Sequence, residues 1–271
     1  MPVFETGSRE FESLKAGHKG LNTCMKTALI LSGNPRFSID FDSQLANLQN
    51  SDVDVYIAFW RRPEGHDPKI SPNWCNLENG EQIVKKLQNE LPANFKIRHA
   101  EVLDENYFGP LPFNYESFNS TPTNVWQQYN ILQYCDRVRR KDYYDLVIRS
   151  RPDLGLSQPI DLLLAYQTLL SNPNLIFSPN NQRYGYFIDH DGCRTGFNDQ
   201  FAIGLSHVMT LYCNAVDYFH QLYMEGIKYN PEYLVQTLLY KHHITWPPTS
   251  WDIVRDPGHY VPIEHGKWGT V

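Results

Sequence analysis

The segment Val53–Trp60, with the sequence VDVYIAFW, constrains the fold more than any other stretch of the chain. Apart from Asp54, its residues are apolar or aromatic, and β-branched and aromatic residues favour strands. A strand that is apolar at nearly every position is typical of a parallel sheet covered on both faces. The segment therefore predicts an α/β protein with helices on both sides of the sheet.

Apolar strand patterns and helical patterns alternate over the first 150 residues. Strands are expected in residues 27–31, 53–60, 95–102 and the first part of 144–153. Helical spacing of apolar residues occupies residues 41–48, 81–91 and the stretch from a cap at Thr123 or Asn124 to Val138. This order predicts a Rossmann-like, doubly wound and mostly parallel sheet. Ligands of such sheets bind at the carboxyl ends of the strands.

The rest of the chain has weaker patterns. We expect a short strand at 175–177, a single helix with an apolar face from Val208 to Leu222, and a helix start at Asn230-Pro231. Residues 104–122 read as a long loop, which in a compact domain is often functional. The length of 271 residues suits one large domain, and we place it at 27–271, after a polar leader at 1–26.

Composition excludes several classes of protein. The formal net charge of −6 disfavours nucleic acid as a partner, because proteins that bind its phosphates are usually basic. No apolar run reaches the ~18 residues of a transmembrane segment, and residues 1–26 lack the apolar core of a secretory signal. The five cysteines are odd in number and have no CxxC spacing, which indicates a reduced, cytoplasmic protein.

The strongest local signal is the sequence Arg149-Ser-Arg-Pro-Asp153 at the end of an expected strand. Arginine side chains bind diphosphates with two parallel hydrogen bonds, and a carboxylate can hold a divalent metal or a ribose hydroxyl. The alternative is a surface network of Arg151 and its neighbours that only ends the strand. The chain has no P-loop, no GxGxxG after its first strand, no GxSxG and no HExxH motif.

Two further groups are candidates for a polar site. Asn198-Asp199-Gln200 combines a carboxylate with two amides, which suits a polyhydroxylated ligand, although these residue types also favour helix N-caps. Asp189 and Asp191 form a DxD spacing in a glycine-bearing loop and could bind a metal through oxygen atoms. Asp52 and Asp54 have the same spacing but lie where a strand begins, at the wrong edge for a ligand.

Five segments in this order resemble a known family, the GT-A-like, nucleotide-sugar-dependent glycosyltransferases of polysaccharide and lipopolysaccharide loci and their relatives in large DNA viruses. The resemblance covers about residues 27–245. Its segments are Leu31–Arg36, Val53–Trp60, Tyr144–Asp153, Phe197–Gly204 and Asn230–Leu234.

The resemblance implies a donor side built from the ends of the first and fourth strands. Gly33 and Arg36 match the turn that holds the nucleotide. Asp153 matches the position of the metal- or ribose-binding DxD, whose first Asp is replaced here by Arg151. Bound Mn²⁺ or Mg²⁺ is therefore one expectation, and neutralisation of the diphosphate by Arg149 and Arg151 is the other.

The resemblance also implies an acceptor side. Asp199 matches the acidic position that contacts the acceptor or acts as a base, and Glu232 is a second candidate for the base. The expected activity is transfer of a sugar from a nucleotide diphosphate to a glycan. The alternatives are a non-catalytic glycan- or nucleotide-binding protein on the same fold, and another transferase, such as a sulfotransferase, which the missing phosphate loop disfavours.

Overall fold

The computed structural model describes residues 25–33, 48, 52–61, 80–104, 106–116, 121–152, 154–156, 159–179, 197–247, 249 and 253–254. The strands are β1 (Thr27–Gly33), β2 (Val53–Trp60), β3 (Phe95–Leu103), β4 (Leu146–Ser150), β5 (Gly155–Leu156), β6 (Ile176–Phe177), β7 (Phe201–Leu205) and β8 (Ile253–Val254). The helices are α3 (Gly80–Glu90), α4 (Pro122–Arg139), α5 (Leu162–Ser171), α6 (Ser206–Cys213), α7 (Val216–Met224) and α8 (Pro231–Lys241).

The main sheet has six strands in the order β3-β2-β1-β4-β7-β6. The pairs β2–β3, β1–β2 and β1–β4 are parallel, whereas β7 runs antiparallel to both β4 and β6. A separate antiparallel pair joins β5 to β8. The prediction of a mostly parallel α/β sheet is therefore confirmed, with one antiparallel strand inside it.

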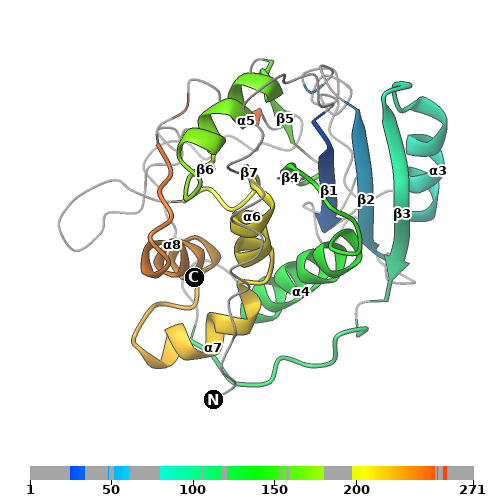
Figure 1. The fold of residues 1–271 in the computed structure, drawn as a ribbon. Helices are drawn as coiled ribbons and strands as arrows, with labels where there is room; N and C mark the ends of the chain where they lie inside the picture. Colours follow the sequence, from blue (N-terminus) through cyan, green and yellow to red (C-terminus); the bar gives the residue numbers. More distant parts are fainter. Residues whose placement is uncertain are drawn as a thin grey trace, which may run out of the picture.

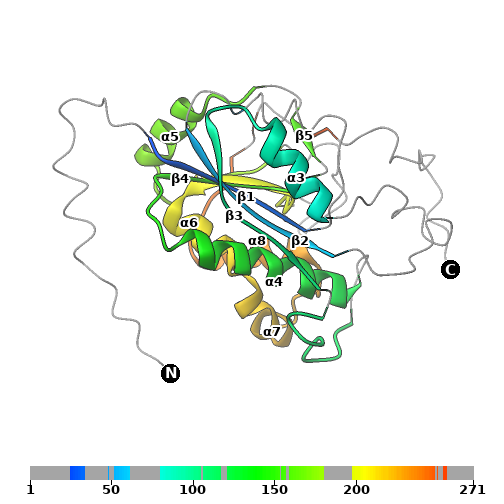
Figure 2. The same cartoon turned by 90° about the vertical axis from the view of Figure 1, so that its right-hand side faces the viewer.

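Helices cover both faces of this sheet, as Figures 1 and 2 show. Alternate residues of β1 separate the two cores: Ala28 and Ile30 pack in the cluster that includes residues of α4, α6, α7 and α8, whereas Leu29 and Leu31 pack with residues of α3 and α5. All seven residues of β1 and all eight of β2 are buried. This two-sided burial explains why their sequences show no polar alternation.

The structure differs from the expected elements in the second half of the chain. The helix expected over 208–222 is two helices, α6 and α7, separated at Asn214 and Ala215. The cap of α4 is Thr121, with Pro122 in the first turn, and not Thr123 or Asn124. Pro is favoured there because its missing N–H has no partner in a first helical turn.

Other expectations agree with the structure or lie outside it. Asn230 caps α8, because its side chain accepts a hydrogen bond from the backbone N–H of Tyr233. Strands β5, β7 and β8 and helix α5 were not expected from the sequence. Three expected segments lie outside the described residues: the helix at 41–48, the leader apart from residues 25 and 26, and the glycine-bearing loop with Asp189 and Asp191.

A polar network occupies the amino edge of the sheet, where Asp54 lies as predicted. Asp54 accepts a hydrogen bond from the Tyr144 hydroxyl at 2.8 Å and pairs with Arg98 at 2.8 Å. The Tyr144 hydroxyl is also 2.7 Å from that of Tyr56. Burial alone would raise the pKa of Asp54, but the hydrogen bonds from Arg98 and Tyr144 outweigh it and lower this pKa. Asp54 therefore has a structural role: it joins Arg98 and Tyr144 at the amino edge of the sheet.

Candidate functional site

The direction in which successive strands are added to the sheet reverses between β1 and β4. Strands β2 and β3 are added on one side of β1, and β4 is then added on the other side. Such a switch point leaves a crevice at the carboxyl ends of the two strands, where ligands of α/β sheets bind. The register pairs Leu31 of β1 with Ser150 of β4, so Gly33 and Arg151 lie at this edge.

Gly33 has the backbone conformation that favours glycine. Its φ angle is 121°, and among the described residues no atom beyond its chain neighbours lies within 4 Å of the place that a Cβ atom would occupy. Within the described part of the structure, the end of β1 therefore has open space beside its backbone, as a site for a ligand at the switch point requires.

Strand β7 brings a second polar segment to the same edge. Because β7 is antiparallel to β4, it begins where β4 ends, and Phe201 pairs with Ser150. The residues just before β7 are Asn198, Asp199 and Gln200. The topology thus places Asn198, Asp199 and Gln200 near Arg151, although these residues are almost fifty positions away in the sequence.

These residues form a turn and do not cap a helix. The Asn198 side chain accepts a hydrogen bond from the backbone N–H of Gln200 at 2.9 Å, and the Ser178 hydroxyl donates to the Asn198 carbonyl at 3.1 Å. The chain then enters β7 rather than a helix. The helix-capping alternative for Asn198 and Asp199 is therefore wrong.

Asp199 is a buried carboxylate of which one oxygen atom, Oδ2, is held by hydrogen bonds from α4. Its side chain receives two hydrogen bonds, from Gln128 Nε2 and from the Tyr129 hydroxyl, each 3.1 Å from Oδ2. Within the described part of the chain, no hydrogen bond reaches Oδ1. Only 3% of the residue is exposed. One carboxylate oxygen is thus fixed by α4, while the other is left to accept a proton or a hydroxyl group.

The backbone of Asp199 is fixed as firmly as its side chain. Its carbonyl oxygen accepts hydrogen bonds from the Tyr212 hydroxyl of α6, at 2.6 Å, and from the Arg149 guanidinium of β4. Arg149 lies inside β4, not after it, and has no exposed surface. Its Nε atom is buried and has no hydrogen-bond partner among the described residues. In this structure Arg149 therefore holds the backbone of Asp199 in place through its carbonyl oxygen.

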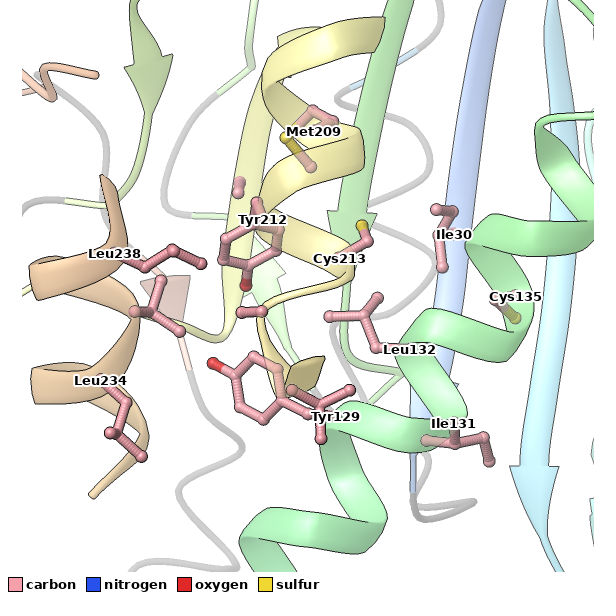
Figure 3. Close-up of a cluster of buried hydrophobic side chains, with 14 of the residues drawn as sticks. Ile30, Tyr129, Ile131, Leu132, Cys135, Met209, Tyr212, Cys213, Leu234 and Leu238 are labelled. Carbon is pink, nitrogen blue, oxygen red and sulfur yellow. The ribbon is translucent and has the colours of Figure 1, made fainter. Parts of the chain in front are cut away.

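The two tyrosines around Asp199 lie between α4, α6 and α8, where their side chains face each other (Figure 3). Burial raises the pKa of Tyr129 well above its usual value, and the negative charges of Asp199 and Glu232 raise it further. Burial likewise raises the pKa of Tyr212. Both hydroxyls therefore remain protonated donors. The charge of Glu232, in the first turn of α8, acts on the same hydroxyl group as that of Asp199.

The structure thus brings Arg149 and Asp199 together beside Tyr129, with Gly33 and Arg151 at the same edge of the sheet, and it places Glu232 in the first turn of α8. The remaining candidates, Arg36, Asp153, Asp189 and Asp191, lie outside the described residues. Among the residues that are described, no three His, Cys, Asp or Glu side chains gather as a metal site would require.

The residues that hold Asp199 were not predicted from the sequence. Tyr129 and Gln128 lie in the helix that was expected to end near Val138, and neither was assigned a role in a site. The available signal was chemical: a tyrosine in a buried apolar stripe needs a partner for its hydroxyl. Which acceptor it would find could not be read locally, because Asp199 is 70 positions away.

A hollow elsewhere in the described structure does not compete with this site. It is an open surface depression of about 510 Å³ between α3 and β3, with Arg61, Glu81 and Glu101 among its lining residues. Arg61 pairs there with Glu81 at 3.2 Å and with Asp104 at 2.9 Å. Its charge is therefore compensated by the protein itself.

Comparison with known proteins assigns no family to the chain. No protein-family model matches the chain, and no curated protein matches it significantly. In the described parts of the chain, none of the helices combines the length and apolar character needed to cross a membrane.

Proposed function

We propose that this chain is a GT-A-like glycosyltransferase that moves a sugar from a nucleotide diphosphate to a hydroxyl group of a glycan. The observation that carries the proposal is the position of Asp199, a buried carboxylate with one fixed oxygen, beside the carboxyl end of β4 in a mostly parallel sheet. The ordered sequence segments that resemble this family support the same conclusion.

Asp199 is our candidate for the general base. Transfer to a hydroxyl group requires removal of its proton, and a positioned carboxylate can accept it. The hydrogen bonds from Gln128 and Tyr129 hold Oδ2 and so direct Oδ1. Glu232 is the second candidate, because its charge reaches the same tyrosine hydroxyl.

The donor would bind at the ends of β1 and β4. Gly33 leaves room beside its backbone for the nucleotide, and the half-buried Arg151 supplies a cation at the same edge. We assign to Arg151 the neutralisation of the leaving diphosphate, the charge that develops in the transition state. From the sequence, Arg36 joins the nucleotide side and Asp153 is the residue to hold Mn²⁺ or Mg²⁺. Arg149, being fully buried, acts through Asp199.

Thermal melting in the presence of nucleotides tests the donor side. We expect one of the diphosphates UDP, GDP and dTDP, with or without Mn²⁺ or Mg²⁺, to raise the melting temperature more than the monophosphate CMP does. At 100 times its dissociation constant a ligand stabilises by about 2.7 kcal/mol. Arg151→Ala should reduce this shift strongly, because it removes the proposed diphosphate contact.

The control is Arg137→Ala, which removes an exposed arginine from the last turn of α4 and should leave the shift unchanged. Absence of a shift with every nucleotide, or an equal shift in Arg151→Ala, would refute this donor site.

A further inference from the structure

An unbroken series of aromatic rings leads from the candidate site to the surface. Tyr129, which holds Asp199, lies with its ring 4.9 Å from that of Phe219 in α7. Phe219 is 6.1 Å from Tyr229, and Tyr229 stacks on Tyr115 at 4.0 Å. These centroid distances describe direct ring contacts, so α4, α7 and the segment 106–116 form one aromatic wall.

The wall ends in an exposed stacked pair. The rings of Phe113 and His220 are 3.8 Å apart and tilted by only 13°. Phe113 is 48% exposed, and His220 is exposed as well. The Tyr115 hydroxyl lies 3.3 Å from His220 Nδ1, which fixes the imidazole ring beside the phenyl ring. A rigid aromatic face is therefore open to solvent next to polar ring atoms.

The location of this pair connects it to the site. Segment 106–116 follows the carboxyl end of β3, and Figure 1 shows that the chain between β3 and α4 passes close to α7. The carboxyl ends of β1 and β4, where Gly33 and Arg151 lie, face the same edge of the sheet because these strands are parallel.

We propose that the Phe113–His220 pair is the platform on which the acceptor glycan lies. A sugar ring has an apolar C–H face, which packs on an aromatic ring, and an edge of hydroxyl groups, which need polar partners. Phe113 offers the first and the His220 ring the second. Because Phe113 is 48% exposed, the pair contributes less to folding than a fully buried aromatic pair would. The role of the bound glycan as acceptor rests on the proposed function, whereas binding of the glycan does not.

Saturation-transfer NMR on the whole chain tests the platform. The probes are a defined set of neutral trisaccharides with glucose, galactose, mannose or N-acetylglucosamine units, without nucleotide. We expect at least one to bind at millimolar concentration, and Phe113→Ala to weaken it roughly tenfold, which is the loss of a contact worth about 1.4 kcal/mol.

The matched control is Tyr107→Ala. Tyr107 is 55% exposed on the same segment, but its ring contacts Phe108 and Tyr134 and not the wall. Tyr107→Ala should leave trisaccharide binding within twofold, and both variants should keep the melting temperature of the original chain.

Two results would overturn the platform: binding of no trisaccharide at 10 mM, or equal binding by Phe113→Ala and the original chain. Trisaccharide binding that depends on Phe113 in a protein that transfers no sugar would keep the platform and refute the proposed function. The two failures are thus distinguishable.

Discussion

Asp199→Asn is expected to lower the rate of sugar transfer by at least about 100-fold, because a positioned general base contributes roughly 10²–10⁴ to a rate. Asparagine has the same shape, and its amide oxygen can still accept the hydrogen bonds that Gln128 and Tyr129 donate to Oδ2. The variant should therefore fold normally and keep its melting shift with the donor nucleotide. The measurement is the initial rate of nucleotide release in the presence of acceptor.

The control for this variant is Asp217→Asn, which neutralises an exposed carboxylate in the first turn of α7 and should leave the rate unchanged. A loss in Glu232→Gln, with Asp199→Asn retaining more than a tenth of the rate, would assign the base to Glu232 instead. A protein that binds nucleotide or glycan but shows only a modest loss of affinity in Asp199→Ala would be a binding module rather than an enzyme.

Asp136→Asn is expected to destabilise the fold by about 3–5 kcal/mol, the usual cost of leaving one charge of a buried ion pair without its partner. Asp136 and Arg139 of α4 are 0% and 1% exposed, and their side chains are 2.7 Å apart. Arg139 also donates hydrogen bonds to Ser206 at 2.7 Å and Thr210 at 2.9 Å in α6, while Asn214 donates to Asp136.

This ion pair also bears on the site. Burial raises the pKa of Asp136, and the charge of Arg139 opposes that rise by favouring the carboxylate. The pair fastens α4 to α6, the two helices that hold Asp199 through Tyr129 and Tyr212. Loosening it should therefore disturb the support of Asp199 as well as the fold.

Urea denaturation measures the change in stability. Arg137→Ala, an exposed position in the same helix, should change the free energy of unfolding by less than about 0.5 kcal/mol. Replacing both buried charges, as Asp136→Leu with Arg139→Met, should recover most of the loss, since no unpaired charge is then buried. A loss below about 1 kcal/mol in Asp136→Asn would show that the pair does not fasten the helices.

The sequence predicted the parts of this fold whose signal is local. The limits of β2 agree with the prediction to the residue, and Asn230 caps α8 as expected. The apolar runs of β1 and β2 are unambiguous because both faces of each strand are buried. The convergence of Gly33 and Arg151 also followed from the sequence, since parallel strands end at one edge of the sheet.

What the sequence did not reveal depends on contacts between distant residues. β7 is five residues long and leads directly into α6, so its apolar pattern merges with that of the helix. Arg149 looked like the charged end of a strand, because its partner, the Asp199 carbonyl, is 50 positions away. The roles of Tyr129 and Tyr212 could not be predicted for the same reason.

In the proposed reaction a sugar leaves a nucleotide diphosphate at this edge of the sheet and joins a glycan. Its most direct test incubates the chain with sugar-labelled UDP-, GDP- and dTDP-sugars, with Mn²⁺ or Mg²⁺, and with the trisaccharides that bind it. We predict that one donor yields a labelled tetrasaccharide and free nucleotide in equal amounts, and that Asp199→Asn or Glu232→Gln abolishes both products. Tight binding of a nucleotide with no labelled product from any donor, or a product that persists in both variants, would contradict the account.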